Sequence, residues 1–189
     1  MLAYSSVAQI GYMLLGMSLL SQQSLTATFV TLFNHGVTKA TLFMSLGVLT
    51  LYSGRSFLSD LQGVGKIMPW IGASFLIGGL SLVGIPGTAG FVSKWMLVQA
   101  TIELGFPMLA VLIIMSSLIA IVYIWKVIEC LYFMEPVSNL KSQRVSFRIL
   151  IPLWLLSGSC IYWGIDPSLV INTSDSAVAN LFSHFKAFN

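Results

Sequence analysis

The chain has 189 residues, of which 57% are hydrophobic and 8% are charged, and its mean hydropathy is +0.91. Soluble domains carry about 25% charged residues, so this composition excludes an ordinary soluble domain and predicts several membrane-spanning helices. The formal net charge of +3 is small and scattered, which argues against a nucleic acid partner.

A helix needs about 20 mainly apolar residues to cross a bilayer. The first such segment begins at the start of the chain, without the positive region of a signal peptide, so we expect a fragment or one part of a split subunit. The tail at 166–189 is mildly polar, which favours a short interfacial helix. The expected spans are residues 2–21, 25–52, 69–84, 87–104, 107–133 and 148–165.

With six spans, both chain ends lie on one side of the membrane, together with the loop at 53–68. The loop at 134–147 lies on the other side. It carries or borders three basic residues against two in the first loop, and basic residues in short loops favour the cytoplasm. We therefore expect the loop at 134–147 to be cytoplasmic.

Three ionisable residues fall inside expected spans rather than at their ends. Lys39 lies near the middle of residues 25–52, and Lys94 near the middle of residues 87–104. A lysine at a helix centre costs about 2.5–3.5 kcal/mol on insertion scales. His35 precedes Lys39 by four residues, so the two side chains share one helix face, one turn apart.

These residues favour a proton relay. Burial disfavours the charged form of an amine, so a buried lysine can gain and lose a proton near neutral pH, and histidine needs little tuning to do so. The alternative is that each lysine is a structural cation paired with a carboxylate, and that the histidine only forms a hydrogen bond. The candidate carboxylates Glu103, Glu129 and Glu135 all lie near span ends, so a partner would have to come from another chain.

Polar side chains accompany the lysines and could line such a relay. Thr31, Asn34 and Thr38 lie near His35 and Lys39, and Thr31 and Thr38 follow helical spacing. Near Lys94, Ser93 adds a hydroxyl. The alternative for each hydroxyl is a bond to a carbonyl of its own helix.

Pro86, Gly87 and Gly90 predict an interruption within a turn or two of Lys94. Segments interrupted by glycine and proline line cavities in transporters. The alternative is a tight turn between two spans. The stretch "GIPGTAGFVSK" is not a phosphate-binding loop, because its glycines lack the GxxxxGK[ST] spacing.

The sequence contains no HExxH motif, dinucleotide fingerprint or paired-histidine haem pattern. Cys130 and Cys160 lie far apart in apolar sequence and form no metal-spaced cluster. We expect buried thiols, and no cofactor, metal or catalytic site in this chain.

The stretches "LAYSSVAQIGYMLLG", "FNHGVTKATLF" and "GLSLVGIPGTAGFVSKW", in this order, resemble the antiporter-like subunits of respiratory complex I and of multisubunit cation/proton (Mrp-type) antiporters. Within that superfamily the resemblance is greatest to the D-type branch of the Mrp subunits. The motifs cover about the first 100 residues, and the order of the spans extends the resemblance to about residue 165.

The resemblance implies an all-α membrane fold built from two inverted five-helix repeats. Residues 1–133 would be the second repeat, residues 134–165 a loop with one further helix, and residues 166–189 the C-terminal tail. Another chain or segment would supply the first repeat, with its glutamate–lysine pair.

The resemblance also implies roles for the buried residues. Lys94, on a discontinuous helix, would be the terminal relay site, Lys39 the central site and His35 the bridge between them. Thr31 stands where some relatives carry a further histidine, so this sequence departs from the family pattern at the far end of the histidine relay.

We therefore predict a membrane subunit that conducts protons, with or without exchange for Na⁺, within a larger assembly in the lipid bilayer, in a bacterial inner membrane. Any redox chemistry of an NADH-quinone oxidoreductase-like complex would belong to other subunits. The rival prediction is a structural subunit whose buried lysines are locked in ion pairs.

Overall fold

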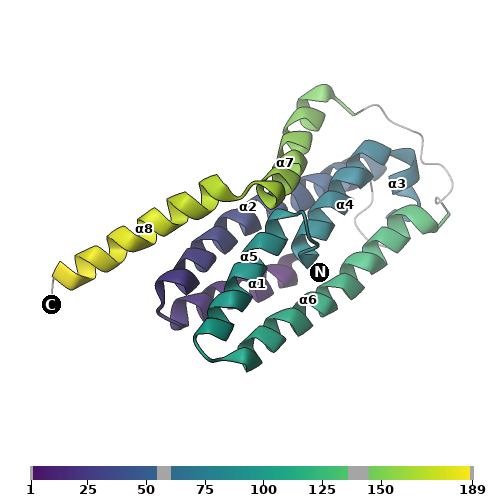
Figure 1. The fold of residues 1–189 in the computed structure, drawn as a ribbon. Coiled ribbons are helices and arrows are strands. Elements are labelled where there is room, and N and C mark those ends of the chain that lie inside the picture. Colours follow the sequence, from purple (N-terminus) through teal and green to yellow (C-terminus); the bar gives the residue numbers. More distant parts are fainter. Residues whose placement is uncertain (1, 55–60, 136–144, 188–189) are drawn as a thin grey trace.

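The computed structural model describes residues 2–54, 61–135 and 145–187, which form helices and no strands (Figure 1). Each expected span corresponds to a helix whose ends lie within a few residues of the expectation. In chain order the helices are α1 (Leu2–Ser18), α2 (Gln22–Ser53), α3 (Val64–Ile67), α4 (Pro69–Val83), α5 (Ala89–Glu103), α6 (Pro107–Ile128), the π-helix η2 (Glu129–Phe133), α7 (Phe147–Ile165) and α8 (Ser168–Ala187).

The central element is α2, which has 32 residues and packs against α1, α4, α5, α7 and α8. It begins at a capping box in which the Ser21 and Ser24 hydroxyl groups each accept the other residue's backbone N–H. It ends at Gly54, whose φ of 67° is in the left-handed region that favours glycine. A helix of this length, about 48 Å at 1.5 Å per residue, provides the axis of the bundle.

Helices α4 and α5 follow one another along α2, joined by residues 84–88 (Figure 1). Each has 15 residues, or about 22 Å, which is shorter than the roughly 30 Å hydrocarbon core of a bilayer. Gly84 ends α4 with a φ of 89°, and Gly87 in the connection has a φ of 87°. The chain path is therefore interrupted near the middle of the bundle.

The described residues that border the loops at 53–68 and 134–147 lie at the same end of the bundle, which corrects the expectation of opposite sides. The Gly63 N–H donates to the Cys130 carbonyl, and the Lys66 amine donates to the Met134 carbonyl at 3.3 Å. The reason is that α4 and α5 run on in one direction instead of turning back. Arg55, Lys141 and Arg144, used in the topology argument, lie outside the described residues.

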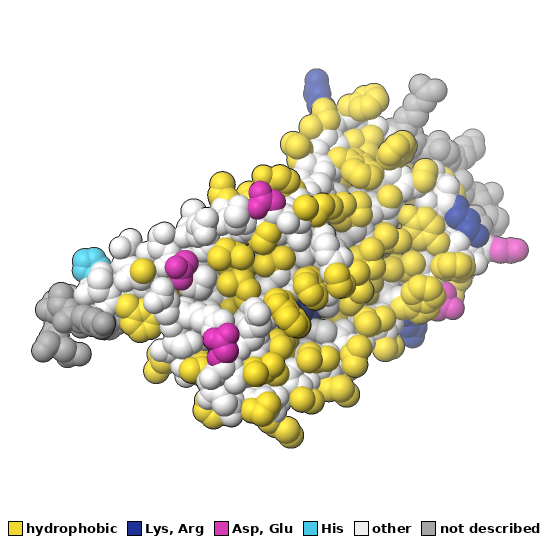
Figure 2. Space-filling view, viewed as in Figure 1, with side chains coloured by type: hydrophobic (Ala, Val, Ile, Leu, Met, Phe, Trp, Pro, Cys, Tyr) yellow, Lys and Arg dark blue, Asp and Glu magenta, His cyan; other side chains and the backbone are white. Residues whose placement is uncertain are grey.

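Two helices in the described ranges are long and apolar enough to cross a membrane by length and composition, namely Pro107–Phe133, which joins α6 to η2, and Phe147–Ile165. The bundle surface is also apolar: hydrophobic side chains cover much of the face in Figure 2, and the acidic groups in view lie over its left part and at its right end. On α6, Met108, Val122 and Ile119 are between 65% and 80% exposed. Such a continuous apolar surface suits lipid or other membrane subunits rather than water.

The tail beyond α7 forms α8, which lies along the first half of α2 and then extends past it (Figure 1). Asp175 of α8 accepts hydrogen bonds from Gln22 at 3.2 Å and Thr26 at 3.1 Å. These bonds attach the tail to the first turns of α2.

Candidate functional site

Lys94 lies on α5 beside the interruption and is 9% exposed. Its Nζ donates to the Leu82 carbonyl at 2.9 Å and to the Val83 carbonyl at 2.7 Å. These are the last two residues of α4, where unpaired carbonyls form the negative end of the helix dipole. The ammonium thus caps α4, and it also lies 5.8 Å from the centroid of the Tyr12 ring.

The interruption is tightly packed. A Cβ on Gly84 would lie 3.1 Å from Cδ of Lys94, and one on Gly90 would overlap the Ser81 carbonyl oxygen. Gly90 therefore sits in the first turn of α5 and allows α5 to touch α4, while Pro86 and Gly87 lie in the connection itself. The glycines set how closely the two helix ends approach each other.

Helix α2 holds both sides of the interruption by hydrogen bonds. Asn34 Nδ2 donates to the Ala89 carbonyl at 2.8 Å, and Thr38 Oγ1 bonds Ser81 Oγ at 2.8 Å. The Ser81 oxygen in turn accepts the Gly90 N–H at 3.2 Å. The predicted lining residues Asn34 and Thr38 therefore join α2 to α4 and α5.

The other two predicted lining residues bond to their own helices. Thr31 donates to the Ala27 carbonyl at 2.6 Å, and Ser93 donates to the Gly90 carbonyl at 3.2 Å. This is the back-bonding alternative that the sequence left open.

Lys39 is 6% exposed and faces α1 rather than α5. Its Nζ donates to the Leu2 carbonyl and to the Ser5 hydroxyl, and lies 5.7 Å from the centroid of the Phe43 ring. Within the described residues, the acceptors of Lys39 and Lys94 are carbonyl and hydroxyl oxygens, not carboxylates.

His35 is half-buried, one turn before Lys39 on α2. Its Nδ1 atom is buried and has no hydrogen-bond partner in the described part of the chain, and the same is true of Asn34 Oδ1. Buried polar atoms are normally satisfied by protein or by water, so these two atoms call for a partner, such as water, from outside the described residues.

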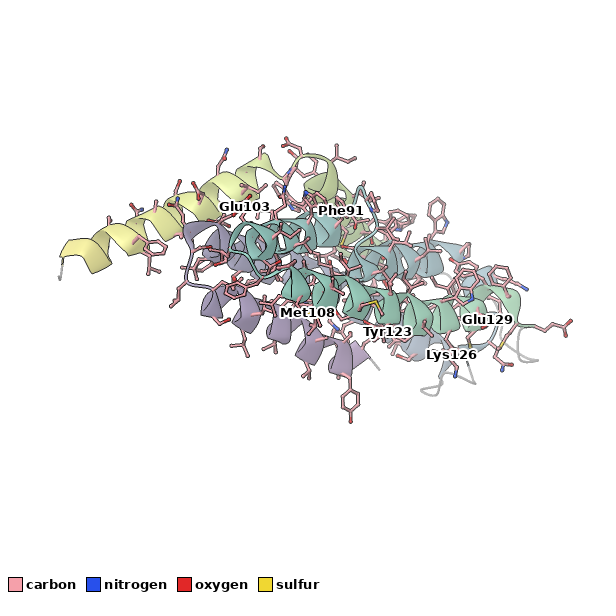
Figure 3. The ribbon with its side chains drawn as sticks, turned by 60° about the horizontal axis from the view of Figure 1, so that its bottom comes forward. Phe91, Glu103, Met108, Tyr123, Lys126 and Glu129 are labelled. Carbon is pink, nitrogen blue, oxygen red and sulfur yellow. The ribbon has the colours of Figure 1, made fainter. Side chains whose placement is uncertain are left out.

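A cavity of about 420 Å³ lies between α1, α5 and α6. We call it the α1–α6 cavity. Lys94 lines it on one side, and Ser5, which accepts from Lys39, lines it on another. Figure 3 shows Tyr123, a further lining residue, on α6 between Met108 and Lys126.

Sequence reasoning missed the cavity residues of α1, although a signal was present. Ser5, Gln9 and Tyr12 are spaced by four and three residues, which puts them on one helix face. The acidic residues Glu103 and Glu129 are exposed near helix ends, as expected. Both cysteine thiols are buried, also as expected.

Comparison with known proteins bears on this arrangement. Residues 1–120 match the family model "NADH:quinone oxidoreductase/Mrp antiporter, TM". The chain belongs to this family. It is an antiporter-like integral membrane subunit, which confirms the resemblance drawn from its three motifs.

The chain is 38% identical over 145 residues to NADH-quinone oxidoreductase subunit N of Desulforudis audaxviator (strain MP104C), covering 76% of this chain and 29% of that protein. The solved Mrp complex from Dietzia sp. DQ12-45-1b contains a similar chain, with a TM-score of 0.89, 25% identity, and coverage of 96% of this chain and 42% of that one.

A chain of the membrane-bound sulfane sulfur reductase, an archaeal respiratory membrane complex, is similar with a TM-score of 0.85 and 30% identity. That match covers 95% of this chain and 36% of the other. The chain thus spans well under half the length of these relatives. These three similar proteins are subunits of multisubunit membrane complexes. We therefore expect other membrane subunits as neighbours of this chain.

Proposed function

We propose that this chain translocates protons across the membrane as part of an Mrp-type or complex I-like assembly. The observation that carries the proposal is the ammonium of Lys94, buried at the interruption and held by two backbone carbonyls. A carbonyl pair stabilises positive charge without the full countercharge of a carboxylate, so the lysine can release its proton at modest cost.

The relay would use three residues in the roles drawn from the family resemblance. Lys94 is the terminal site, Lys39 the central site, and His35 a bridge whose unpaired Nδ1 can accept a proton from water. Exchange of protons for Na⁺ belongs to the same proposal, because Mrp antiporters are among the structures that this chain resembles.

Helices α4 and α5 would form one broken crossing rather than the two crossings first expected. Their lengths and their order along α2 support this. The chain then crosses as α1, α2, α4–α5, α6–η2 and α7. Residues 1–133 would hold four crossings of the second five-helix repeat, rather than all five, with 134–165 as the added helix and 166–189 as the tail. A partner chain or segment would supply the first repeat.

The end of the bundle that carries α3 and η2 would face the cytoplasm of a bacterial inner membrane, together with the loop at 134–147. Lys66 of α3 and Arg148 at the start of α7 belong to described segments at this end, and the sequence that adjoins these segments contains Arg55, Lys141 and Arg144. The turns at 19–21 and 104–106, at the other end, contain no lysine or arginine. This asymmetry follows the positive-inside rule.

The rival function is structural, with both lysines locked in ion pairs. It would need a carboxylate from another chain, since the acceptors within the described residues are carbonyls and a hydroxyl. Removal of one partner of such a pair leaves an uncompensated buried charge and would cost about 3–5 kcal/mol.

Lys94→Met tests the proposal, because it keeps the chain length and removes the titrating group. In the intact complex in proteoliposomes we expect proton transport to fall at least about a hundredfold, within the range for loss of an essential acid or base, with normal assembly. Lys126→Met is the matched control, because Lys126 is exposed near the end of α6. Normal transport by an assembled Lys94→Met complex would rule out the relay role.

A further inference from the structure

We infer that the junction of α7 and α8 receives a membrane-spanning helix of another subunit, which places a lysine or arginine against the Asp166 carboxylate. The receiving surface, which we call the Asp166 face, consists of Asp166, Ser168, Asn172 and Ser176. This inference rests on the broken crossing of α4 and α5 proposed above, and not on the proton relay.

Helix α7 ends at Asp166 because Pro167 follows it. The residue before a proline is disfavoured from helical backbone, and Asp166 has φ −124° and ψ 86°. One oxygen of its carboxylate, Oδ1, accepts the Ser168 N–H at 3.2 Å and the Ser168 hydroxyl at 2.6 Å, at the start of α8. The other oxygen has no donor within the described residues, and the side chain is exposed.

The end of α7 lies at the level of the interruption between α4 and α5. A Cβ on Gly164 would overlap the Gly87 carbonyl oxygen in the connection between these two helices. Helices α4 and α5 have 15 residues each, so the interruption divides the broken crossing near its middle. Asp166 follows Gly164 by two residues and therefore lies near the middle of the membrane. The first turns of α8 complete the crossing that α7 begins.

The lengths of α7 and α8 give the same depth. The Trp154 ring lies 5.7 Å from the Trp70 ring at the start of α4, and tryptophans are enriched at the membrane interface. At the opposite end of the bundle, Asp175 accepts a hydrogen bond from Gln22 in the first turn of α2. At 1.5 Å per residue, Asp166 lies about 18 Å from the level of Trp154 and about 14 Å from that of Asp175. The two levels are thus separated by about the thickness of a hydrocarbon core, roughly 30 Å.

An exposed carboxylate at this depth calls for a cation. Charged side chains inside membranes normally pair with one another rather than face lipid. Lys39 and Lys94 are held by carbonyl and hydroxyl oxygens. The nearest basic residues along the chain on either side of Asp166 are Arg148 and Lys186, about 27 Å and 30 Å away at the helical rise. The matching cation therefore has to come from another chain.

The outer face of α8 suits a protein helix better than lipid. Helix α8 packs on α2, and Val170 and Val178 are buried. On the opposite face, Ser168, Asn172 and Ser176 follow one another at intervals of four residues and are exposed. The Asn172 amide has no hydrogen-bond partner within the described residues. Small and amide side chains of this kind allow close contact and hydrogen bonds between membrane helices.

The Asp166 face is separate from the cavities that Lys94 lines. The α1–α6 cavity is lined by residues of α1, α5 and α6, and a second cavity, of about 280 Å³, by residues of α5, α6 and the end of α4. Neither cavity is lined by α7 or α8. An interface between subunits therefore explains the charge of Asp166 better than an opening of the Lys94 site does.

The first test removes the charge of Asp166 and keeps its hydrogen bonds. Asp166→Asn retains an oxygen for the Ser168 N–H, since asparagine and aspartate serve about equally well at helix starts. We expect the yield of assembled complex, measured by co-purification of the other subunits, to fall at least about tenfold, because the partner's cation is left unpaired. Asp175→Asn is the matched control at the membrane boundary, and its yield should stay within about twofold of wild type.

The second test uses Asn172→Cys in the otherwise unchanged complex. A benzophenone attached to this cysteine through a maleimide should crosslink to another subunit, in a membrane span that contains a lysine or arginine. In the assembled complex the same cysteine should resist a membrane-impermeant maleimide, because the partner helix covers it.

Three results would overturn the inference. These are a normal yield of the Asp166→Asn complex, a crosslink from Asn172→Cys that reaches no basic span of another subunit, and rapid labelling of Asn172→Cys by the impermeant reagent, which would assign the face to water. Side-specific labelling of cysteines placed before α4 and at the end of α5 tests the broken crossing separately. A failure of that proposal can therefore be distinguished from a failure of this one.

Discussion

At the scale of single residues, the proposed relay requires the charge of Lys94 to come and go, and its acceptors bear on the free energy of that change. A lysine at a helix centre costs about 2.5–3.5 kcal/mol to insert, whereas a cation at a helix C-terminus gains about 0.3–2 kcal/mol. The α4 carbonyls that bind Lys94 therefore offset part of the cost, not all of it. The proposed relay role requires the charged and neutral forms of Lys94 to be close in free energy, and this partial compensation supports that proposal.

The closeness of α4 and α5 gives a prediction at Gly90. A methyl group there would meet the Ser81 carbonyl oxygen, so Gly90→Ala must push the two helix ends apart and should cost about 2 kcal/mol of stability or more. Gly36→Ala on α2 is the control, since nothing lies within 4 Å of its Cβ position. In thermal unfolding of the purified protein, Gly90→Ala should unfold at a lower temperature than Gly36→Ala. Equal unfolding temperatures would contradict the close packing of α4 and α5.

Lys39 and His35 should differ in importance. Lys39→Met removes the donor to Leu2 and Ser5 and should reduce proton transport in proteoliposomes about as strongly as Lys94→Met, roughly a hundredfold. His35→Ala should reduce proton transport less, by about fivefold to tenfold, because water can occupy the vacated space and bridge to Lys39. A His35→Ala defect larger than that of Lys39→Met would reverse the assigned order.

At the scale of helices, the polar face of α2 acts chiefly in assembly of the fold. Ser74 of α4 bonds Ser45 of α2 at 3.0 Å and Ser157 of α7 at 2.6 Å, and all three are fully buried. Hydrogen bonds between membrane helices contribute about 0.6 kcal/mol each on average. This column of serines therefore joins three helices, and we propose that it takes no part in the relay.

Ser74→Ala should consequently lower stability by about 1–2 kcal/mol, because it removes two interhelical bonds, while transport by the assembled complex stays near wild type. Ser159→Ala, at a half-buried position where the hydroxyl bonds the Leu155 carbonyl of its own helix, should change neither the stability nor the transport. Chemical unfolding in detergent measures the first effect and proteoliposome transport the second. Lost transport with unchanged stability would assign Ser74 to the proton path.

Helix ends and buried lysines could be predicted from sequence because they depend on local patterns. The expected span at 107–133 coincides with α6 and η2, and the glycines and proline around Pro86 indicated the interruption. The direction of the chain after that interruption could not be predicted, because a glycine- and proline-rich connection suits a turn and a continuation equally well. The hydrogen-bond acceptors of Lys94 could not be predicted either, because they are backbone carbonyls, which every residue type carries.

At the scale of the whole molecule, the direction of α5 decides the topology. If α4 and α5 form one broken crossing, Lys66 before α4 and Glu103 at the end of α5 lie on opposite sides of the membrane. Lys66→Cys should then react with an impermeant thiol reagent from the cytoplasmic side only, and Glu103→Cys from the other side only. Labelling of both positions from one side would restore the six-span count.

The measurement that tests the central claim most directly is the pH dependence of proton transport by the wild-type and Lys94→Glu complexes in proteoliposomes. An ordinary lysine titrates near pH 10.4 and an ordinary glutamate near pH 4.3, so exchange of the titrating group must move the profile. We predict reduced but measurable transport by Lys94→Glu, with the alkaline limb of its profile shifted to lower pH. The same profile for both complexes would contradict the claim that Lys94 carries the proton.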